Sequence, residues 1–87
     1  MSRLEKIFLK LSSSSTNVNF SELKWLVEHT GFEFKRTNGS HFIYKHPNIA
    51  GIEGLVNIQE VKGQAKPYQV EQIIQLIEKY NLIEEKG

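Results

Sequence analysis

The sequence predicts an α+β domain in which two helices cover one face of a three-stranded antiparallel sheet, with an extra helix at the N-terminus. Three observations predict this class. Residues 20–30 and 67–80 each place apolar residues at helical spacing. Between them, an Asn38-Gly39 dipeptide separates two strand-like runs, and residues 55–58 form a third run. Placing both helices on one sheet face buries both apolar stripes and leaves the other face to solvent.

The composition is that of one small globular domain. Its 87 residues, 39% hydrophobic and 24% charged, suffice for one modest core. No apolar run approaches the ~20 residues of a membrane span, and residues 1–11 mix charged with apolar residues, unlike a signal peptide. The absence of cysteine excludes disulfides, thiolate nucleophiles and zinc fingers. We therefore expect a cytoplasmic protein without membrane association.

The first helix begins with a capping pattern, because Ser2 is followed three residues later by Glu5 and then by apolar residues at helical spacing. The polar run of residues 12–17 lacks apolar side chains that could pack, so we expect a flexible connector. We therefore divide the chain into an N-terminal helix with its connector, residues 1–15, and a single domain, residues 16–87.

The second helix is bounded by a cap and a glycine. Asn19 or Ser21 can cap its start, and Gly31 suits the left-handed conformation that closes a helix. Trp25 lies off the main apolar stripe, which leaves it a structural position at the helix edge or a base-stacking role. The structural position is the favoured interpretation, because an isolated aromatic side chain usually packs.

A hairpin follows this helix. The Asn-Gly dipeptide supplies the positive φ angles of a two-residue turn, so residues 33–37 and 40–46 should pair as antiparallel strands. Side chains alternate across a strand, so Phe42 and Tyr44 share one side and His41 lies on the other. The two aromatic residues should face the core, and His41 should face away from it.

The remaining elements are delimited by the two prolines. Pro47 ends the second strand, and residues 55–58 form a short third strand after a flexible loop. Residues 59–66 are a polar connection, and Pro67 is suited to the first position of the last helix. We expect residues 84–87 to form a frayed tail. The order helix, strand, strand, strand, helix is that of the double-stranded-RNA-binding domain, although a fold alone does not establish function.

A histidine and several cations gather in the middle of the chain. His41 follows the hairpin turn, and an imidazole, with an ordinary pKa of about 6.5, can take and give a proton near neutrality. Five of the eleven Lys and Arg residues fall in this region, against two glutamates: Lys35, Arg36, Lys45, Lys62 and Lys66. The asymmetry fits a polyanion-binding face and, equally, a solvated sheet surface.

Four short motifs occur in a characteristic order: Gly31-Phe32, Gly39-Ser40-His41, His46-Pro47 and Lys66-Pro67. With these motifs the chain resembles, over residues 20–82, the HicA-type toxins of the HicA and HicB toxin-antitoxin systems. The resemblance implies a small ribosome-independent endoribonuclease that cleaves mRNA, on a fold like the double-stranded-RNA-binding domain. It also implies a HicB-type antitoxin that covers the active face. The catalytic histidine of the family falls on His41, and Phe42 stands where many members have a second histidine.

RNA carries its own nucleophile, the 2′-hydroxyl group. Its cleavage without a metal needs a base, a cation for the charged phosphorane and an acid for the leaving oxygen. We expect His41 to be the base and Lys35, Arg36, Lys45 or Lys62 to stabilise the phosphorane. The acid is left open between Tyr44, His46 and a lysine. The residues predicted to bind RNA are Lys35, Arg36, Gly39, Ser40, Lys45, Lys62 and Lys66.

We expect no metal and no cofactor. No His or carboxylate cluster has the spacing of a metal site, and Gly51 and Gly54 lack the strand-to-helix context and the lysine of a nucleotide-binding loop. The expected partners are mRNA and the antitoxin, with no DNA contact by this chain alone. Two rival functions remain: a non-catalytic RNA-binding module of the same fold, and an interaction protein whose exposed sheet face docks a partner.

Overall fold

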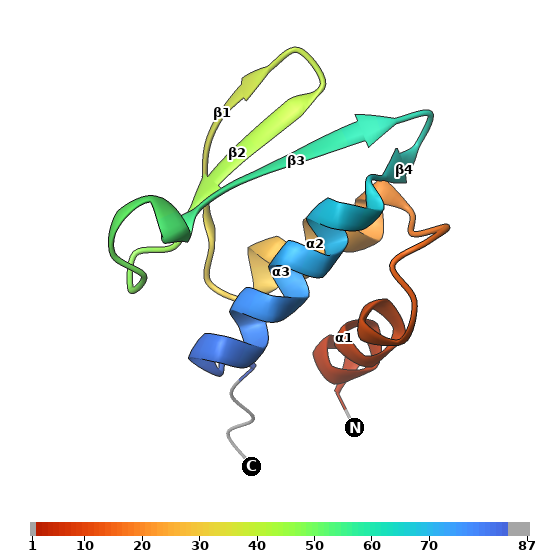
Figure 1. The fold of residues 1–87 in the computed structure, drawn as a ribbon, viewed down its shortest axis with the longest axis horizontal. Helices are drawn as coiled ribbons and strands as arrows, with labels where there is room; N and C mark the ends of the chain where they lie inside the picture. Colours follow the sequence, from red (N-terminus) through yellow and green to blue (C-terminus); the bar gives the residue numbers. More distant parts are fainter. Residues whose placement is uncertain (1, 84–87) are drawn as a thin grey trace.

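The computed structural model describes residues 2–83, which form two layers. A four-stranded antiparallel sheet of order β1-β2-β3-β4 makes one layer, and three helices lie together below it in Figure 1. The α+β class is therefore confirmed. The elements in chain order are α1 (Arg3–Ser13), α2 (Phe20–His29), β1 (Glu33–Asn38), β2 (His41–Lys45), η1, a 3-10 helix (Gly51–Gly54), β3 (Leu55–Val61), β4 (Gln64–Ala65) and α3 (Pro67–Tyr80).

The β1–β2 hairpin is confirmed, but its turn lies one residue later than predicted. Asn38 pairs with His41, so Gly39 and Ser40 are the central residues of the turn. Only Gly39 of these two has a positive φ angle, +62°. Asn38 stays in the strand ladder, whereas the predicted turn required it to adopt a positive φ angle. A bulge at Lys35 absorbs one further residue, because Phe34 pairs with Tyr44 and Arg36 with Ile43.

The prediction of three strands was wrong, because the sheet has a fourth strand, β4. The third strand continues to Val61, and Lys62 and Gly63 then form a tight turn with φ angles of +53° and +80°. Two successive positive φ angles are typical of a two-residue hairpin turn, and β4 follows. The predicted polar connection therefore contains a hairpin. Lysine seldom adopts a positive φ angle, so the Lys-Gly pair gave a weak turn signal.

The residues that directly follow the predicted connector take part in this sheet edge. The backbone N–H of Ala65 donates to the carbonyl of Val18 at 2.9 Å, and that of Phe20 donates to the carbonyl of Gly63 at 2.9 Å. Val18 is buried. The segment from Val18 to Phe20 therefore pairs beside β4, whereas the polar run of residues 12–17 that precedes it is largely exposed.

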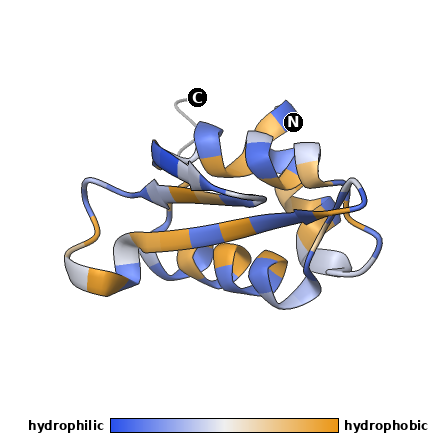
Figure 2. Ribbon diagram, turned by 90° about the horizontal axis from the view of Figure 1, so that it is seen from above, coloured by the Kyte–Doolittle hydropathy of each residue, from blue (hydrophilic) through white to orange (hydrophobic). Residues whose placement is uncertain are grey.

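The core lies between the sheet and the helices. Figure 2 shows hydrophobic and hydrophilic positions alternating along β3, where Val56 and Ile58 are buried. Tyr44 is 0% exposed and the Phe42 ring packs 5.0 Å from that of Phe20, so the prediction that both face the core is confirmed. The helices contribute further buried residues: Leu23, Leu26 and Val27 from α2, and Val70, Ile73 and Ile77 from α3.

Helix α1 packs against α2 and α3. Its start is capped as predicted, since the Ser2 hydroxyl accepts a hydrogen bond from the Glu5 N–H at 3.1 Å. Leu11 is only 1% exposed and belongs to the main core. The Arg3 guanidinium lies 4.5 Å from the centre of the Trp25 ring, which agrees with the structural position favoured for Trp25. The division of the chain at residue 15 stays a prediction.

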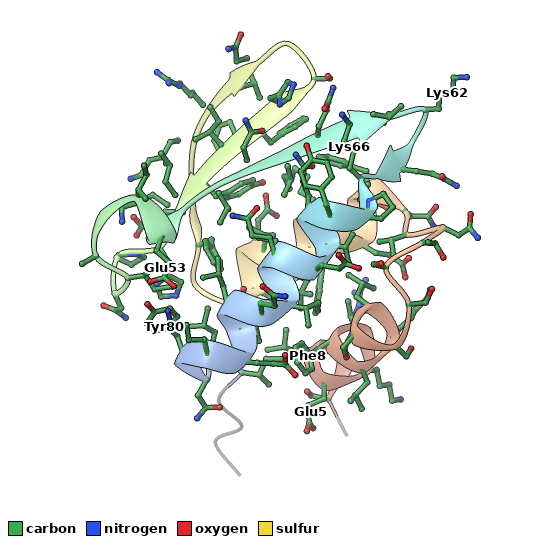
Figure 3. All side chains as sticks on the ribbon, in the orientation of Figure 1. Glu5, Phe8, Glu53, Lys62, Lys66 and Tyr80 are labelled. Carbon is green, nitrogen blue, oxygen red and sulfur yellow. The ribbon has the colours of Figure 1, made fainter. Side chains whose placement is uncertain are left out.

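Helix α3 follows the predicted bounds. Pro67 occupies its first turn, and Asn81 closes it in the left-handed conformation with a φ angle of +50°. The loop before β3 is tied to this end of the helix, because Glu53 accepts hydrogen bonds from Lys79 at 2.6 Å and from the Tyr80 hydroxyl. Glu53 and Tyr80 point toward one another in Figure 3. The predicted tail, residues 84–87, lies outside the described residues, among which no helix is long and apolar enough to span a membrane.

Candidate active site on the open sheet face

The sheet face turned away from the helices, which we call the open face, carries side chains from three strands. Strand alternation and cross-strand pairing assign its members: Glu33, Arg36, Asn38, His41, Ile43, Lys45, Leu55, Asn57 and Gln59. Cross-strand partners lie on the same face, and Gln59 is the partner of His41 on β3. The prediction that His41 faces away from the core agrees with this assignment.

His41 is held by a hydrogen bond to the neighbouring strand. Its Nδ1 atom lies 2.9 Å from the Oδ1 atom of Asn57. An amide oxygen can only accept, so Nδ1 carries the proton and donates it. The Nε2 atom of the neutral ring then keeps its lone pair. His41 is half-buried, which leaves part of the ring open to solvent on this face.

The turn before His41 is fastened to β3 as well. The Ser40 carbonyl accepts from the Glu60 N–H at 3.2 Å, and the Ser40 hydroxyl accepts from the Gln59 amide at 3.3 Å. The Gln59 backbone N–H donates to Oε1 of the buried Gln69 at 2.7 Å, which links this strand to α3. Gly39 has open space where a side chain would begin. A phosphate could therefore approach the backbone at this turn closely.

Two of the predicted RNA-binding cations extend from β1. Arg36 pairs with Ile43 and so shares the open face with His41. Lys35 occupies the bulge, and its ammonium lies 3.6 Å from a carboxylate oxygen of Glu33. Both basic side chains are exposed. They are free to meet a polyanion, since an exposed ion pair such as that of Lys35 is weak and easily exchanged.

Lys45 is engaged in a different contact. Its ammonium donates to the backbone carbonyls of Ile49 at 2.6 Å and Gly51 at 3.0 Å. These bonds hold the loop between β2 and η1 against the end of the strand. The geometry gives Lys45 a structural task, and its RNA contact stays a prediction.

Lys62 and Lys66 lie at the β3–β4 end of the sheet, as Figure 3 shows. Lys62 is part of the β3–β4 turn, and Lys66 precedes the first residue of α3. The Lys66 ammonium lies 5.9 Å from the centre of the ring of Tyr68, which is exposed. Strand β3 lies beside the turn before His41 at Gln59 and Glu60, and Lys62 and Lys66 follow these residues in the chain. Arg36 lies on β1, on the opposite side of β2 from β3.

Two of the three predicted candidates for the general acid lie inside the protein. Tyr44 is fully buried and donates to the Glu28 carboxylate at 2.7 Å, and burial raises the pKa of Tyr44 above its ordinary value. His46 is 4% exposed, and its Nε2 donates to the Thr30 carbonyl at 3.1 Å. Neither side chain reaches the open face. A lysine is the predicted candidate that remains.

Asn57 is not among the predicted site residues, yet it contacts His41 directly. A signal was present in the sequence, because the polar Asn57 and Gln59 alternate with the apolar Val56 and Ile58. This alternation marks the polar pair as facing away from the core. The strand register, which brings Asn57 to His41, required the tertiary structure.

Within residues 2–83, no group of three or more His, Cys, Asp or Glu side chains is arranged to hold a metal ion. The polar groups of the open face and its turn are an imidazole, amides, a hydroxyl and cations, with the Glu33 carboxylate at the far end of β1. Such a set can remove a proton and stabilise a negative charge.

The fold and this site together define a small α+β protein whose open sheet face carries a histidine among basic residues. A family model described as the HicA toxin of bacterial toxin-antitoxin systems matches residues 20–78. The chain thus belongs to the HicA toxin family, and the resemblance noted in the sequence is confirmed. No curated protein and no solved structure matches the chain. Likeness to the double-stranded-RNA-binding domain stays a prediction.

Proposed function

We propose that this chain is a metal-independent endoribonuclease that cleaves mRNA, with His41 as the general base, and that a HicB-type antitoxin neutralises it. One observation supports the catalytic part most directly. His41 lies on the open sheet face with Nδ1 bonded to Asn57, and within residues 2–83 no hydrogen bond engages its Nε2 atom. Membership of the HicA toxin family supports the toxin role.

The reaction follows from the chemistry of this face. The Nε2 lone pair of His41 removes the proton of a 2′-hydroxyl group, and the freed oxygen attacks the adjacent phosphorus. The bond from phosphorus to the 5′-oxygen breaks, and that oxygen takes up a proton from an acid such as a lysine ammonium. The products are a 2′,3′-cyclic phosphate and a 5′-hydroxyl end. Arg36 shares the open face and can stabilise the charge that develops on the phosphorane.

The first experiment incubates purified protein with a long single-stranded RNA in EDTA and identifies the product ends. His41→Ala should lower the cleavage rate by about 10²- to 10⁴-fold. His29→Ala is the matched control, because His29 is exposed on α2 and not on the open face, and its ring stacks on Trp25. The control should cleave like the parent and leave cyclic phosphate ends. Full cleavage by His41→Ala would refute the assignment of the base.

The same experiment separates the enzyme from the rival RNA-binding module. A binding module would leave the RNA intact in every lane and would bind it with an affinity that falls steeply with salt concentration. An interaction protein would show no measurable RNA affinity even at low salt. Retained RNA binding by a cleavage-deficient His41→Ala variant is the result expected of the enzyme.

The open face offers a surface to which the antitoxin can bind. Leu55 is 46% exposed there beside polar Asn57 and half-buried Ile43, so the face offers apolar area among hydrogen-bonding groups. Co-expression of a HicB-type partner should relieve growth arrest, and the complex should protect His41 from a histidine-modifying reagent. A complex that leaves His41 accessible would argue against blocking of this face.

A further inference from the structure

We propose that Asn57 is a positioning residue that holds neutral His41 in the tautomer with its proton on Nδ1, so that Nε2 is presented to RNA as the proton acceptor. This inference rests on the proposed role of His41 as the base. Asn57 lies on β3, whereas His41 lies on β2. None of the four family motifs in the sequence contains Asn57.

The hydrogen bond is built by the strand register. Asn57 pairs with Ile43, and His41 pairs with Gln59, so Asn57 is the diagonal neighbour of His41 on the same face. The flanking residues of β3, Val56 and Ile58, are 1% and 0% exposed. Their burial fixes the orientation of the strand, which therefore directs the Asn57 side chain onto the open face.

The chemistry depends on where the single proton of a neutral imidazole resides. Only the form with Nδ1–H leaves a lone pair on Nε2, and an acceptor beside Nδ1 selects this form. The Oδ1 atom of Asn57 at 2.9 Å is such an acceptor. A general base that is already in the reactive tautomer is available in a larger fraction of encounters with RNA.

No competing group on this face takes the place of Asn57. The Gln59 amide is engaged with the Ser40 hydroxyl at 3.3 Å. The charged members of the open face come from β1 and β2, namely Glu33, Arg36 and Lys45, with Lys35 at the bulge beside them. Strand β3 contributes the uncharged Leu55, Asn57 and Gln59. Asn57 thus orients the imidazole without the charge of a carboxylate, which would favour the protonated ring.

The direct test is the protonation pattern of the His41 ring, read by nitrogen-15 NMR above the pH at which the ring becomes neutral. The parent should carry its proton on Nδ1, and Asn57→Ala should shift the population toward the Nε2–H form. Gln72→Ala is the matched control, because it removes an exposed amide from α3. An Nε2–H ring in the parent, or an unchanged ring in Asn57→Ala, would overturn the proposal.

Kinetics provide the second measurement. Asn57→Ala should lower kcat/KM for RNA by about 2- to 10-fold, the equivalent of one hydrogen bond. Asn57→Asp retains the acceptor but adds a charge that favours the imidazolium. Its acidic limb in the pH–rate profile should therefore move upward by about one pH unit. An unmoved limb would show that residue 57 does not face the Nδ1 atom of His41, which would contradict the contact on which the proposal rests.

The two proposals fail in different ways. If neither the parent nor any variant cleaves RNA, the endoribonuclease assignment fails, while the NMR experiment still decides whether Asn57 sets the tautomer. If the parent cleaves RNA and Asn57→Ala changes neither the ring nor the rate, only the role of Asn57 fails. Asn57 is exposed, so the Ala variant should fold, and its amide spectrum verifies this.

Discussion

At the scale of single residues, two neighbouring cations of the same face have different tasks. Arg36 extends from β1 and is exposed, whereas the ammonium of Lys45 is bonded to two loop carbonyls. Their residue types alone predict the same phosphate contact for both. Local geometry separates them, because a lysine whose ammonium is bonded to two backbone carbonyls is no longer a free surface charge.

We expect Lys45→Met to destabilise the protein by about 1 to 3 kcal/mol, because two hydrogen bonds from a charged donor are lost. Arg36→Met, the matched control, should change the free energy of unfolding by no more than about 0.5 kcal/mol. Arg36→Met should instead weaken RNA binding and reduce its salt dependence. Urea unfolding and RNA titrations measure the two effects. Equal stability of the two variants would contradict the structural task of Lys45.

At the scale of elements, a polar contact joins β2 to α2. The buried Tyr44 hydroxyl donates to the Glu28 carboxylate at 2.7 Å, and Glu28 also accepts from Lys24 at 2.9 Å. The hydrogen bond from Lys24 is the largest cause that lowers the pKa of Glu28, and the bond from Tyr44 adds to it. The contact therefore depends on the ionised carboxylate.

This lowered pKa predicts how stability changes in acid. The folded state binds the proton of Glu28 more weakly than the unfolded state, so the contribution of Glu28 is present above the ordinary glutamate pKa of 4.5. It is lost as the pH falls through the lower, folded pKa. Between about pH 5 and pH 3, the parent should lose more stability than Glu28→Gln in urea unfolding. Parallel pH profiles for the two proteins would refute the coupling.

At the scale of the whole molecule, α1 completes the core on the side away from the sheet. Leu11 is 1% exposed, whereas Leu9 on the same helix is 50% exposed. Leu11→Ala should destabilise the whole protein by about 2 to 5 kcal/mol, while Leu9→Ala should cost no more than about 0.5 kcal/mol. Thermal or urea unfolding followed at Trp25 measures both. Equally small losses of stability in the two variants would show that packing of α1 contributes little to the core.

The local features of the fold were predictable because their causes lie close together in the chain. Apolar residues at helical spacing mark α2 and α3, Ser2 caps α1, and Pro67 begins α3 as expected. The hairpin before His41 was predicted from its turn residues, although its turn lies one residue later. Strand alternation likewise placed His41 opposite Phe42 and Tyr44.

The parts that sequence did not predict depend on residues far apart in the chain. Strand β4 has only two residues, and its edge is completed by hydrogen bonds to Val18 and Phe20, more than forty positions earlier. The register of β2 and β3 brings Asn57 to His41. The ammonium of Lys45 is bonded to a carbonyl of the loop that follows β2, which only the folded chain brings into reach. The sequence by itself determined the α+β class, the family and the placement of His41 on the strand face away from Phe42 and Tyr44, because periodicity, turn residues and motifs are local. Tertiary structure decided what each polar group contacts, because a hydrogen bond depends on positions in space within about 3 Å.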